Sequence, residues 1–137
     1  MTISIWDKYT ASHIYDSEII WSGPNSNSLP LDCPIHIITA YNPFDQIFSF
    51  YENRCRNELL LVDIKNHSAE IKPVIVSSPN HDWQDESFAV HGISREQACD
   101  LAQSYDQRAI FELNHNQLIV VAVNSYQVKR SRPRNIE

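Results

Sequence analysis

The sequence predicts an α+β fold, a two-layer sandwich on a split-βαβ (ferredoxin-like) sheet, with an extra C-terminal strand and an N-terminal helical appendage. Apolar runs of strand character alternate with two segments of helical periodicity, in the order strand, helix, strand, strand, helix, strand, strand. The chain has 137 residues, of which 42% are hydrophobic and 20% are charged, which is typical of one globular domain with a buried core.

The first 34 residues are predicted to be an N-terminal appendage followed by a loop. Trp6 and Tyr9 share one face at helical spacing, and residues 18–21 have the apolar character of a short strand. Residues 23–34 are rich in Pro, Asn and Ser, which favour turns and loops. This loop is too short to separate two domains.

The core domain is predicted to span residues 35–123 and to contain five strands. The expected strands are residues 36–41, 71–76, 87–91, 108–113 and 118–123. The last two are expected to form a hairpin across a four-residue loop. An apolar edge at 118–123 would favour a homodimer formed by pairing of edge strands.

Two helices are predicted in this domain, and we expect them to pack on the same face of the sheet. The first covers about residues 45–63, and its apolar stripe is expected to consist of Phe48, Tyr51, Cys55, Leu59 and Val62. The second covers about residues 94–105. It begins with a Ser94-x-x-Gln97 capping box, which satisfies two backbone N–H groups at its start.

Residues 124–137 differ from the rest of the chain in charge. Residues 1–123 carry 7 Lys/Arg against 16 Asp/Glu, whereas residues 124–137 carry four basic residues and Glu137. We expect a basic, flexible tail with little apolar surface to bury. An acidic body is a poor general nucleic-acid binder, so only this tail would favour contact with RNA.

Several function classes lack their sequence signatures. Only Gly23 and Gly92 are present, so neither a phosphate-binding P-loop nor a dinucleotide fingerprint fits. The histidines and cysteines do not show zinc spacing, and we expect neither a metal nor a cofactor. Three widely spaced cysteines, together with the absence of a signal peptide or a long apolar run, favour the cytoplasm and no membrane association.

A polar row on the first helix is the strongest candidate for a site. Ser49, Asn53 and Asn57 recur every four residues, away from the expected apolar stripe. One interpretation is a solvated helix face. The other is a row of amides that offers donors and acceptors to a ligand.

Three groups of segments together resemble a known family. These are Ile-Thr-Ala-Tyr-Asn-Pro (38–43) with Ser-x-x-x-Asn-x-x-x-Asn (49–57), Trp-x-x-Glu-Ser-Phe-Ala-Val-x-Gly (83–92) with Ala-x-x-Leu-Ala (98–102), and Gln-x-Ala-Ile-Phe-Glu-Leu (107–113) with Leu-x-Val-Val (118–121). In order and spacing they resemble a family of small bacterial proteins, DUF3293, over about residues 35–121. The resemblance implies a bacterial source and a compact domain, but no established activity and no catalytic residues.

The matched segments contain polar positions that packing alone does not require, and these define a candidate ligand site. Its residues are Asn42, Asn53, Asn57, Trp83, Glu86, Gln107 and Glu112. We expect Asn53, Asn57 and Glu86, with either Gln107 or Glu112, to converge at one concave surface bordered by Trp83.

Three functions remain open on this basis. The first hypothesis is a non-enzymatic binding or regulatory module for a small ligand or a protein partner. The second is a small hydrolase or transferase in which Glu86 or Glu112 acts as general base and the asparagines orient the substrate. The third is a nucleic-acid accessory protein that binds through the basic tail.

Overall fold

The structure, a computed structural model, describes residues 4–136, except for the side chain of Asp45. The helices are α1 (Ile5–Thr10), α2 (Phe50–Lys65), α3 (Arg95–Ser104) and the short 3-10 helix η1 (Pro43–Asp45). The strands are β1 (His13–Tyr15), β2 (Ile20–Pro24), β3 (Ile35–Ile38), β4 (Glu70–Ser77), β5 (Gln84–His91), β6 (Ala109–Leu113), β7 (Gln117–Ala122), β8 (Val128–Pro133) and β9 (Asn135–Ile136).

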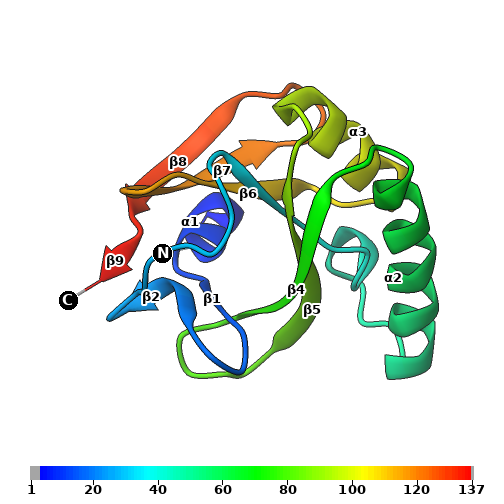
Figure 1. Cartoon of the computed structure of the whole chain (residues 1–137). Coiled ribbons are helices and arrows are strands. Elements are labelled where there is room, and N and C mark those ends of the chain that lie inside the picture. Colours follow the sequence, from blue (N-terminus) through cyan, green and yellow to red (C-terminus); the bar gives the residue numbers. More distant parts are fainter. Residues whose placement is uncertain (1–3, 137) are drawn as a thin grey trace.

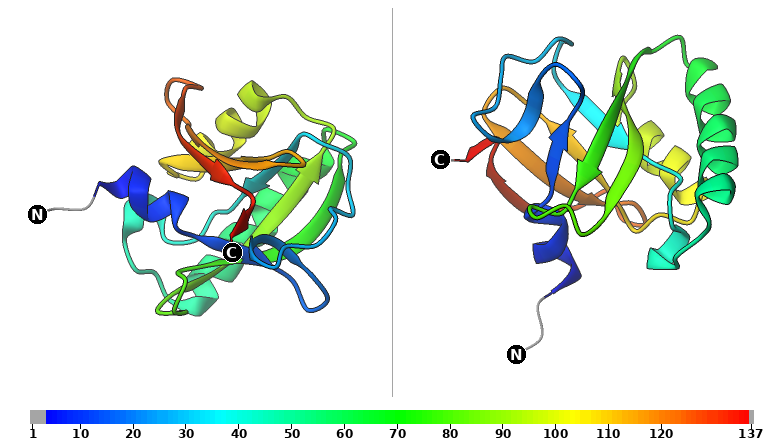
Figure 2. Two further views of the ribbon diagram at one scale, coloured as in Figure 1. Left: turned by 90° about the vertical axis from the view of Figure 1, so that its left-hand side faces the viewer. Right: turned by 90° about the horizontal axis from the view of Figure 1, so that it is seen from below.

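All nine strands belong to one mixed sheet that curls into a nearly closed barrel (Figures 1 and 2). Their order is β8-β7-β6-β3-β5-β4-β1-β2-β9. Strand β9 pairs with β2 in parallel, and the other neighbouring pairs are antiparallel. Only Arg134 separates β8 from β9 in the chain, although these strands stand at opposite ends of the order. The two ends of the sheet are therefore brought together.

The alternation of side chains along the strands produces two hydrophobic cores. One core fills the barrel and includes Trp21, Ile37 and Leu113. The other lies between the outer face of the sheet and the helices α2 and α3, and it includes Ile38 and Leu60. Both helices thus cover the same outer face (Figure 1).

The predicted ferredoxin-like sandwich is wrong. In a two-layer sandwich the face opposite the helices would be open to solvent, whereas here it forms the interior of the barrel. The error arose at the two ends of the chain. Residues 1–34 contribute β1 and β2, and residues 124–137 contribute β8 and β9, so four strands extend the central sheet and curve it over its own inner face.

The ends of the chain are consequently integral parts of the barrel. Residues 128–136, which we expected to be a flexible tail, form β8 and β9. The guanidinium group of Arg134 donates to the carbonyl oxygens of Trp21 (3.0 Å), Asn27 (2.7 Å) and His115 (3.0 Å).

The predicted edge strand is β7, but it is paired on both sides, by β6 and β8. It offers no free edge for dimerisation, and the homodimer itself stays a prediction.

Helix α2 is rotated relative to the predicted packing. Its buried residues are Asn53, Asn57, Leu60 and Ile64. Much of the predicted apolar stripe instead faces solvent, with Tyr51 exposed at 75%, Leu59 at 61% and Val62 at 58%. The physical reason is that the two asparagine amides find backbone partners inside the protein.

The predicted capping box of α3 is confirmed, with Ser94 and Gln97 bonded reciprocally.

Candidate functional site: the mouth of the barrel

A cavity of about 280 Å³ opens at one end of the barrel. Side chains of β3, β4, β5, β6 and α1 line it, together with residues of the segments that follow β3 and precede β5 and β6. Four of the lining side chains are aromatic: Tyr9, Tyr41, Trp83 and Phe111. A hollow with aromatic walls and a few polar groups is typical of small-ligand sites, which often lie in the mouths of β-barrels.

Strand geometry decides which side chains reach this cavity. Successive residues of a strand point to opposite faces of a sheet. On β5, Asp85 lines the cavity, Glu86 and Phe88 line a second hollow on the outer side of the sheet, and Ser87 borders both. Residues adjacent in sequence therefore belong to different surfaces.

Tyr41 is the most informative residue of the cavity wall. Tyr41 is 6% exposed, and its buried hydroxyl makes no hydrogen bond of ordinary geometry to any residue that the structure describes, although the Glu86 carboxylate lies near enough to be an alternative acceptor. Burial, and secondly the charge and hydrogen-bonding capacity of the Glu86 carboxylate, raise the pKa of Tyr41 to about 12. The hydroxyl therefore keeps its proton at neutral pH and has a donor to offer. Buried polar groups without partners are uncommon in folded proteins.

The segment that carries Tyr41 is held in place by the two buried asparagines of α2. The side-chain oxygen of Asn57 accepts from the Ala40 N–H at 2.8 Å, and its amide donates to the Glu86 carbonyl at 2.8 Å. The side-chain oxygen of Asn53 accepts from the Asn42 N–H at 2.9 Å, and its amide donates to the Asn42 side-chain oxygen at 2.9 Å. The two asparagine side chains thus supply backbone hydrogen bonds that a neighbouring strand would otherwise provide just beyond the end of β3.

Two further amides border the cavity with unused hydrogen-bonding capacity. Gln107 donates through its amide nitrogen to the carbonyl oxygens of Tyr41 (2.9 Å) and Tyr105 (3.2 Å). Among the residues that the structure describes, neither the side-chain oxygen of Gln107 nor the amide nitrogen of Asn42 has a partner. The wall therefore presents both an acceptor and donors.

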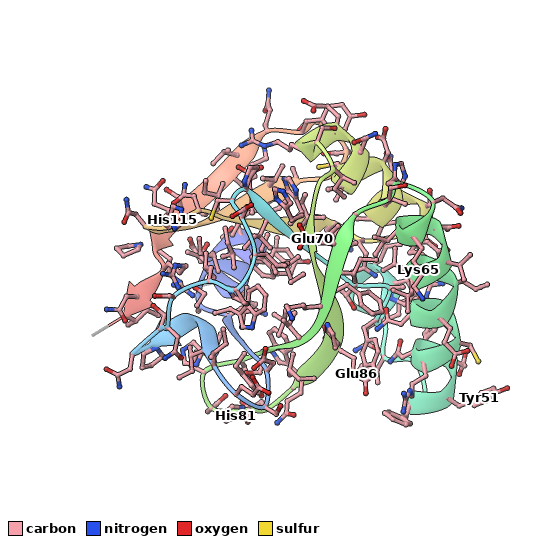
Figure 3. The ribbon with its side chains drawn as sticks, in the orientation of Figure 1. Tyr51, Lys65, Glu70, His81, Glu86 and His115 are labelled. Atoms are coloured by element: carbon pink, nitrogen blue, oxygen red, sulfur yellow. The ribbon has the colours of Figure 1, made fainter. Side chains whose placement is uncertain are left out.

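The second hollow is an open groove of about 610 Å³ between α2 and the outer face of β4 and β5. Asn57 and Glu86 line it, and Figure 3 shows Glu86 on the side of β5 that faces α2. Glu86 lies 3.8 Å from Arg54, and the two side chains are 40% and 54% exposed. Such an exposed pair contributes little to stability, and the open groove is a weaker candidate for enclosing a small molecule.

Glu112 lies apart from both hollows, in a buried ionic cluster. Its carboxylate accepts from Arg95 at 2.8 and 3.0 Å and lies 2.9 Å from Nε2 of the buried His36. The hydrogen bonds from His36 and Arg95 lower the pKa of Glu112 to about 2. A carboxylate of such low basicity, held by two side chains, is poorly suited to act as a general base.

The Glu112 cluster should make the protein sensitive to acid. The folded-state pKa is about 2 against an ordinary 4.5, so the unfolded chain takes up the proton more readily. We expect the contribution of Glu112, roughly 3 kcal/mol, to be present above about pH 5 and to be lost as the pH falls towards 2. Urea unfolding at a series of pH values measures this. Glu112→Gln should flatten the acid limb of the stability curve, whereas the exposed control Glu18→Gln should not; an unchanged acid limb in Glu112→Gln would contradict the assignment.

The seven residues of the predicted site do not converge on one hollow. Asn42, Trp83 and Gln107 line the cavity, Asn57 and Glu86 line the outer groove, Asn53 is buried beside Asn42, and Glu112 lies apart. A binding role for them stays a prediction. Sequence reasoning missed Tyr41 and Ser87, although the strand alternation around Ser87 was a usable signal.

The central part of the chain matches a family model over residues 38–110, and the description of that family is protein of unknown function (DUF3293). The chain belongs to DUF3293. The resemblance seen in the sequence is thereby confirmed. For this DUF3293 chain, a search of the curated proteins found no significant match, and neither did a search of the solved structures. The region matched to DUF3293 includes α2, α3 and most of the residues that line the cavity.

The described part of this DUF3293 chain shows neither a membrane-spanning helix nor a cluster of metal ligands. Within residues 4–136 no helix is long and apolar enough to cross a membrane. Over the same residues, no group of three or more His, Cys, Asp or Glu side chains is arranged to hold a metal ion. The cytoplasmic location and the bacterial source stay predictions.

Proposed function

We propose that this chain is a non-enzymatic binding module that takes a small, planar organic ligand into the mouth of its barrel. The observation that carries the proposal is the buried hydroxyl of Tyr41, a residue in the wall of an aromatic cavity, which makes no hydrogen bond of ordinary geometry to a described residue. A ligand that brings a hydrogen-bond acceptor to this hydroxyl would remove the cost of leaving it unsatisfied.

The size and lining of the cavity support a ligand with one or two rings. About 280 Å³ lies just below the range of pockets that hold drug-sized molecules. Aromatic walls favour a flat apolar body through stacking and edge-to-face contacts. The spare acceptor of Gln107 and the spare donor of Asn42 would orient polar groups at the rim of such a ligand.

The alternative functions have less support. Glu86 and Glu112, the two carboxylates considered as general bases, do not line the cavity. Basic residues of β8 already interact within the chain. Arg132 donates to the carbonyl oxygens of Thr10 and Ser12, and Arg130 pairs with Asp7. These contacts leave less free positive charge for nucleic acid than a flexible tail would offer.

A matched pair of tyrosine variants tests the role of the hydroxyl. The probes are acetophenone, which carries a carbonyl acceptor, and ethylbenzene, which has a similar shape without it. We expect Tyr41→Phe to bind acetophenone about fivefold more weakly than the wild type, while ethylbenzene binds both equally, because one hydrogen bond is worth about 1 kcal/mol. Titrations followed by NMR measure both affinities.

Tyr105→Phe is the control for this test. The Tyr105 hydroxyl donates to Asp63 and does not line the cavity, so its loss should lower stability and leave probe affinity unchanged. The stability of Tyr41→Phe should equal or exceed that of the wild type, because no hydrogen bond is lost. Equal acetophenone affinity in Tyr41→Phe and wild type would contradict the role of the hydroxyl. Failure of both probes to bind saturably would contradict the cavity as a ligand site.

A further inference from the structure

The outward face of α2 is an apolar surface. Nine large hydrophobic side chains are exposed among the residues that the structure describes, and six of them lie between residues 44 and 62. Along α2 itself, Tyr51, Leu59 and Val62 follow one another at steps that keep them on one side of a helix, with the half-buried Cys55 between them. Tyr51 points away from the body of the protein in Figure 3. Exposed apolar side chains gathered in one place, rather than scattered, mark an interaction surface.

No part of the chain that the structure describes covers this surface. The opposite side of α2 is the one that packs on the barrel, through Asn53, Asn57, Leu60 and Ile64. A surface helix normally buries its apolar side chains and exposes its amides. Here the amides are inside, so the stripe of Tyr51, Cys55, Leu59 and Val62, the α2 stripe, is left for a partner.

We propose that the α2 stripe is the interface of a homodimer, in which α2 packs antiparallel against α2 of a second copy. A two-fold axis at the middle of the helix, near residues 56 and 57, brings Tyr51 to the level of the partner's Val62 and Cys55 to within one residue of the partner's Leu59. Each contact then occurs twice, as an isologous interface requires. The stripe is long enough for two or more helical turns to interdigitate at an interaxial distance of about 8–10 Å.

The charges beside the stripe favour this orientation. Arg54 and Glu58 are exposed and lie one turn apart along the same edge of the α2 stripe. The antiparallel two-fold brings Arg54 against the partner's Glu58, and Glu58 against the partner's Arg54. A parallel two-fold would put the Arg54 and Glu58 edges of the two helices on opposite sides of the interface, so these pairs would not form. Among the residues that the structure describes, Arg54 makes the long 3.8 Å contact with Glu86 and lies over the Phe50 ring.

The exposed apolar residues of α2 can be compared with the area that a dimer interface buries. A stable interface buries roughly 800 Å² on each partner, and an aromatic side chain contributes about 150–250 Å² when fully buried. At the start of α2, Phe50 is exposed at 63% and its ring lies under the Arg54 guanidinium, at the flank of the stripe. With Tyr51, Leu59 and Val62 it provides apolar surface for a small, reversible dimer.

The test is the mass of the full chain in solution, measured by light scattering and sedimentation over a range of concentrations. The wild type should be a dimer. Leu59→Glu should raise the dissociation constant about 30-fold or more, because it puts a charge at the centre of the interface in both copies. Val128→Glu is the control, since Val128 is exposed at 47% on β8, far from the α2 stripe. It should leave the dimer intact.

Charge exchange then tests the antiparallel geometry. Arg54→Glu and Glu58→Arg should each weaken the dimer, and the double variant should restore it, because the pairs across the interface are re-formed with reversed sign. A wild type that stays monomeric up to its highest soluble concentration would overturn the proposal and assign the α2 stripe to a different protein. A dimer that survives Leu59→Glu, or a double variant no tighter than the single ones, would overturn it as well.

Discussion

Replacing both buried asparagines of α2 by alanine should lower the free energy of unfolding by about 3–5 kcal/mol. Asn57 is 5% exposed and Asn53 is 4% exposed, and each both accepts and donates a hydrogen bond. Their removal leaves the N–H groups of Ala40 and Asn42 and the Glu86 carbonyl without these partners. A buried group left unsatisfied costs about 1–3 kcal/mol, and the substitution also leaves a small void.

Urea unfolding of Asn53→Ala, Asn57→Ala and the double variant measures the effect. Gln103→Ala is the control, because Gln103 is an exposed amide on α3. It should change the stability by less than about 0.5 kcal/mol. A loss below about 1 kcal/mol in the double variant would mean that the asparagines do not hold the segment after β3, and would instead favour their earlier interpretation as ligand-binding groups on a tolerant surface.

Arg134→Met should cost about 3 kcal/mol, the second largest effect that we expect. Arg134 is 9% exposed, and its guanidinium bonds carbonyl oxygens from β2, from the loop after β2 and from the β6–β7 turn. One side chain thus links the two ends of the sheet. Its loss leaves three carbonyl oxygens without that donor, and methionine fills only part of the volume.

Arg130→Met is the control for this prediction. Arg130 is 43% exposed and pairs with Asp7 at the surface, where an ion pair contributes about 0–1 kcal/mol. Thermal unfolding and hydrogen exchange of β2 and β9 would show whether the closure opens in Arg134→Met. If Arg134→Met were no less stable than Arg130→Met, residues 128–136 would not contribute to the barrel as described.

The central elements of the fold could be predicted because their signals are local. The capping box at Ser94 specifies the start of α3, and the apolar run before Asn42 identifies β3. Strand β8 had no such signal. Five of its six residues are exposed, its sequence Val-Lys-Arg-Ser-Arg-Pro shows no apolar alternation, and it is held by backbone pairing with β7 and by arginine contacts. Without β8 and β9, closure of the sheet could not be anticipated.

The candidate site was predicted only in part, for a related reason. The asparagine row on α2 stood out correctly as unusual, but periodicity alone cannot tell which side of a helix packs inward. The protein buries the amides because unpaired backbone groups after β3 need them, which is a tertiary effect. Trp83 and Gln107 were predicted as site residues from the sequence, and both line the cavity. Tyr41 was passed over because nothing in its local sequence reveals an unsatisfied hydroxyl.

Mapping acetophenone on the amide NMR spectrum of the full chain tests the central claim most directly. If the mouth of the barrel is the ligand site, saturable shifts should concentrate on the amides of Tyr41, Ser87 and Ala109 and on the indole N–H of Trp83, since these residues line the cavity. The amides of α3 should hardly move. Shifts centred instead on the groove between α2 and β4, or shifts that never saturate, would contradict the proposal that this domain binds its ligand inside the barrel.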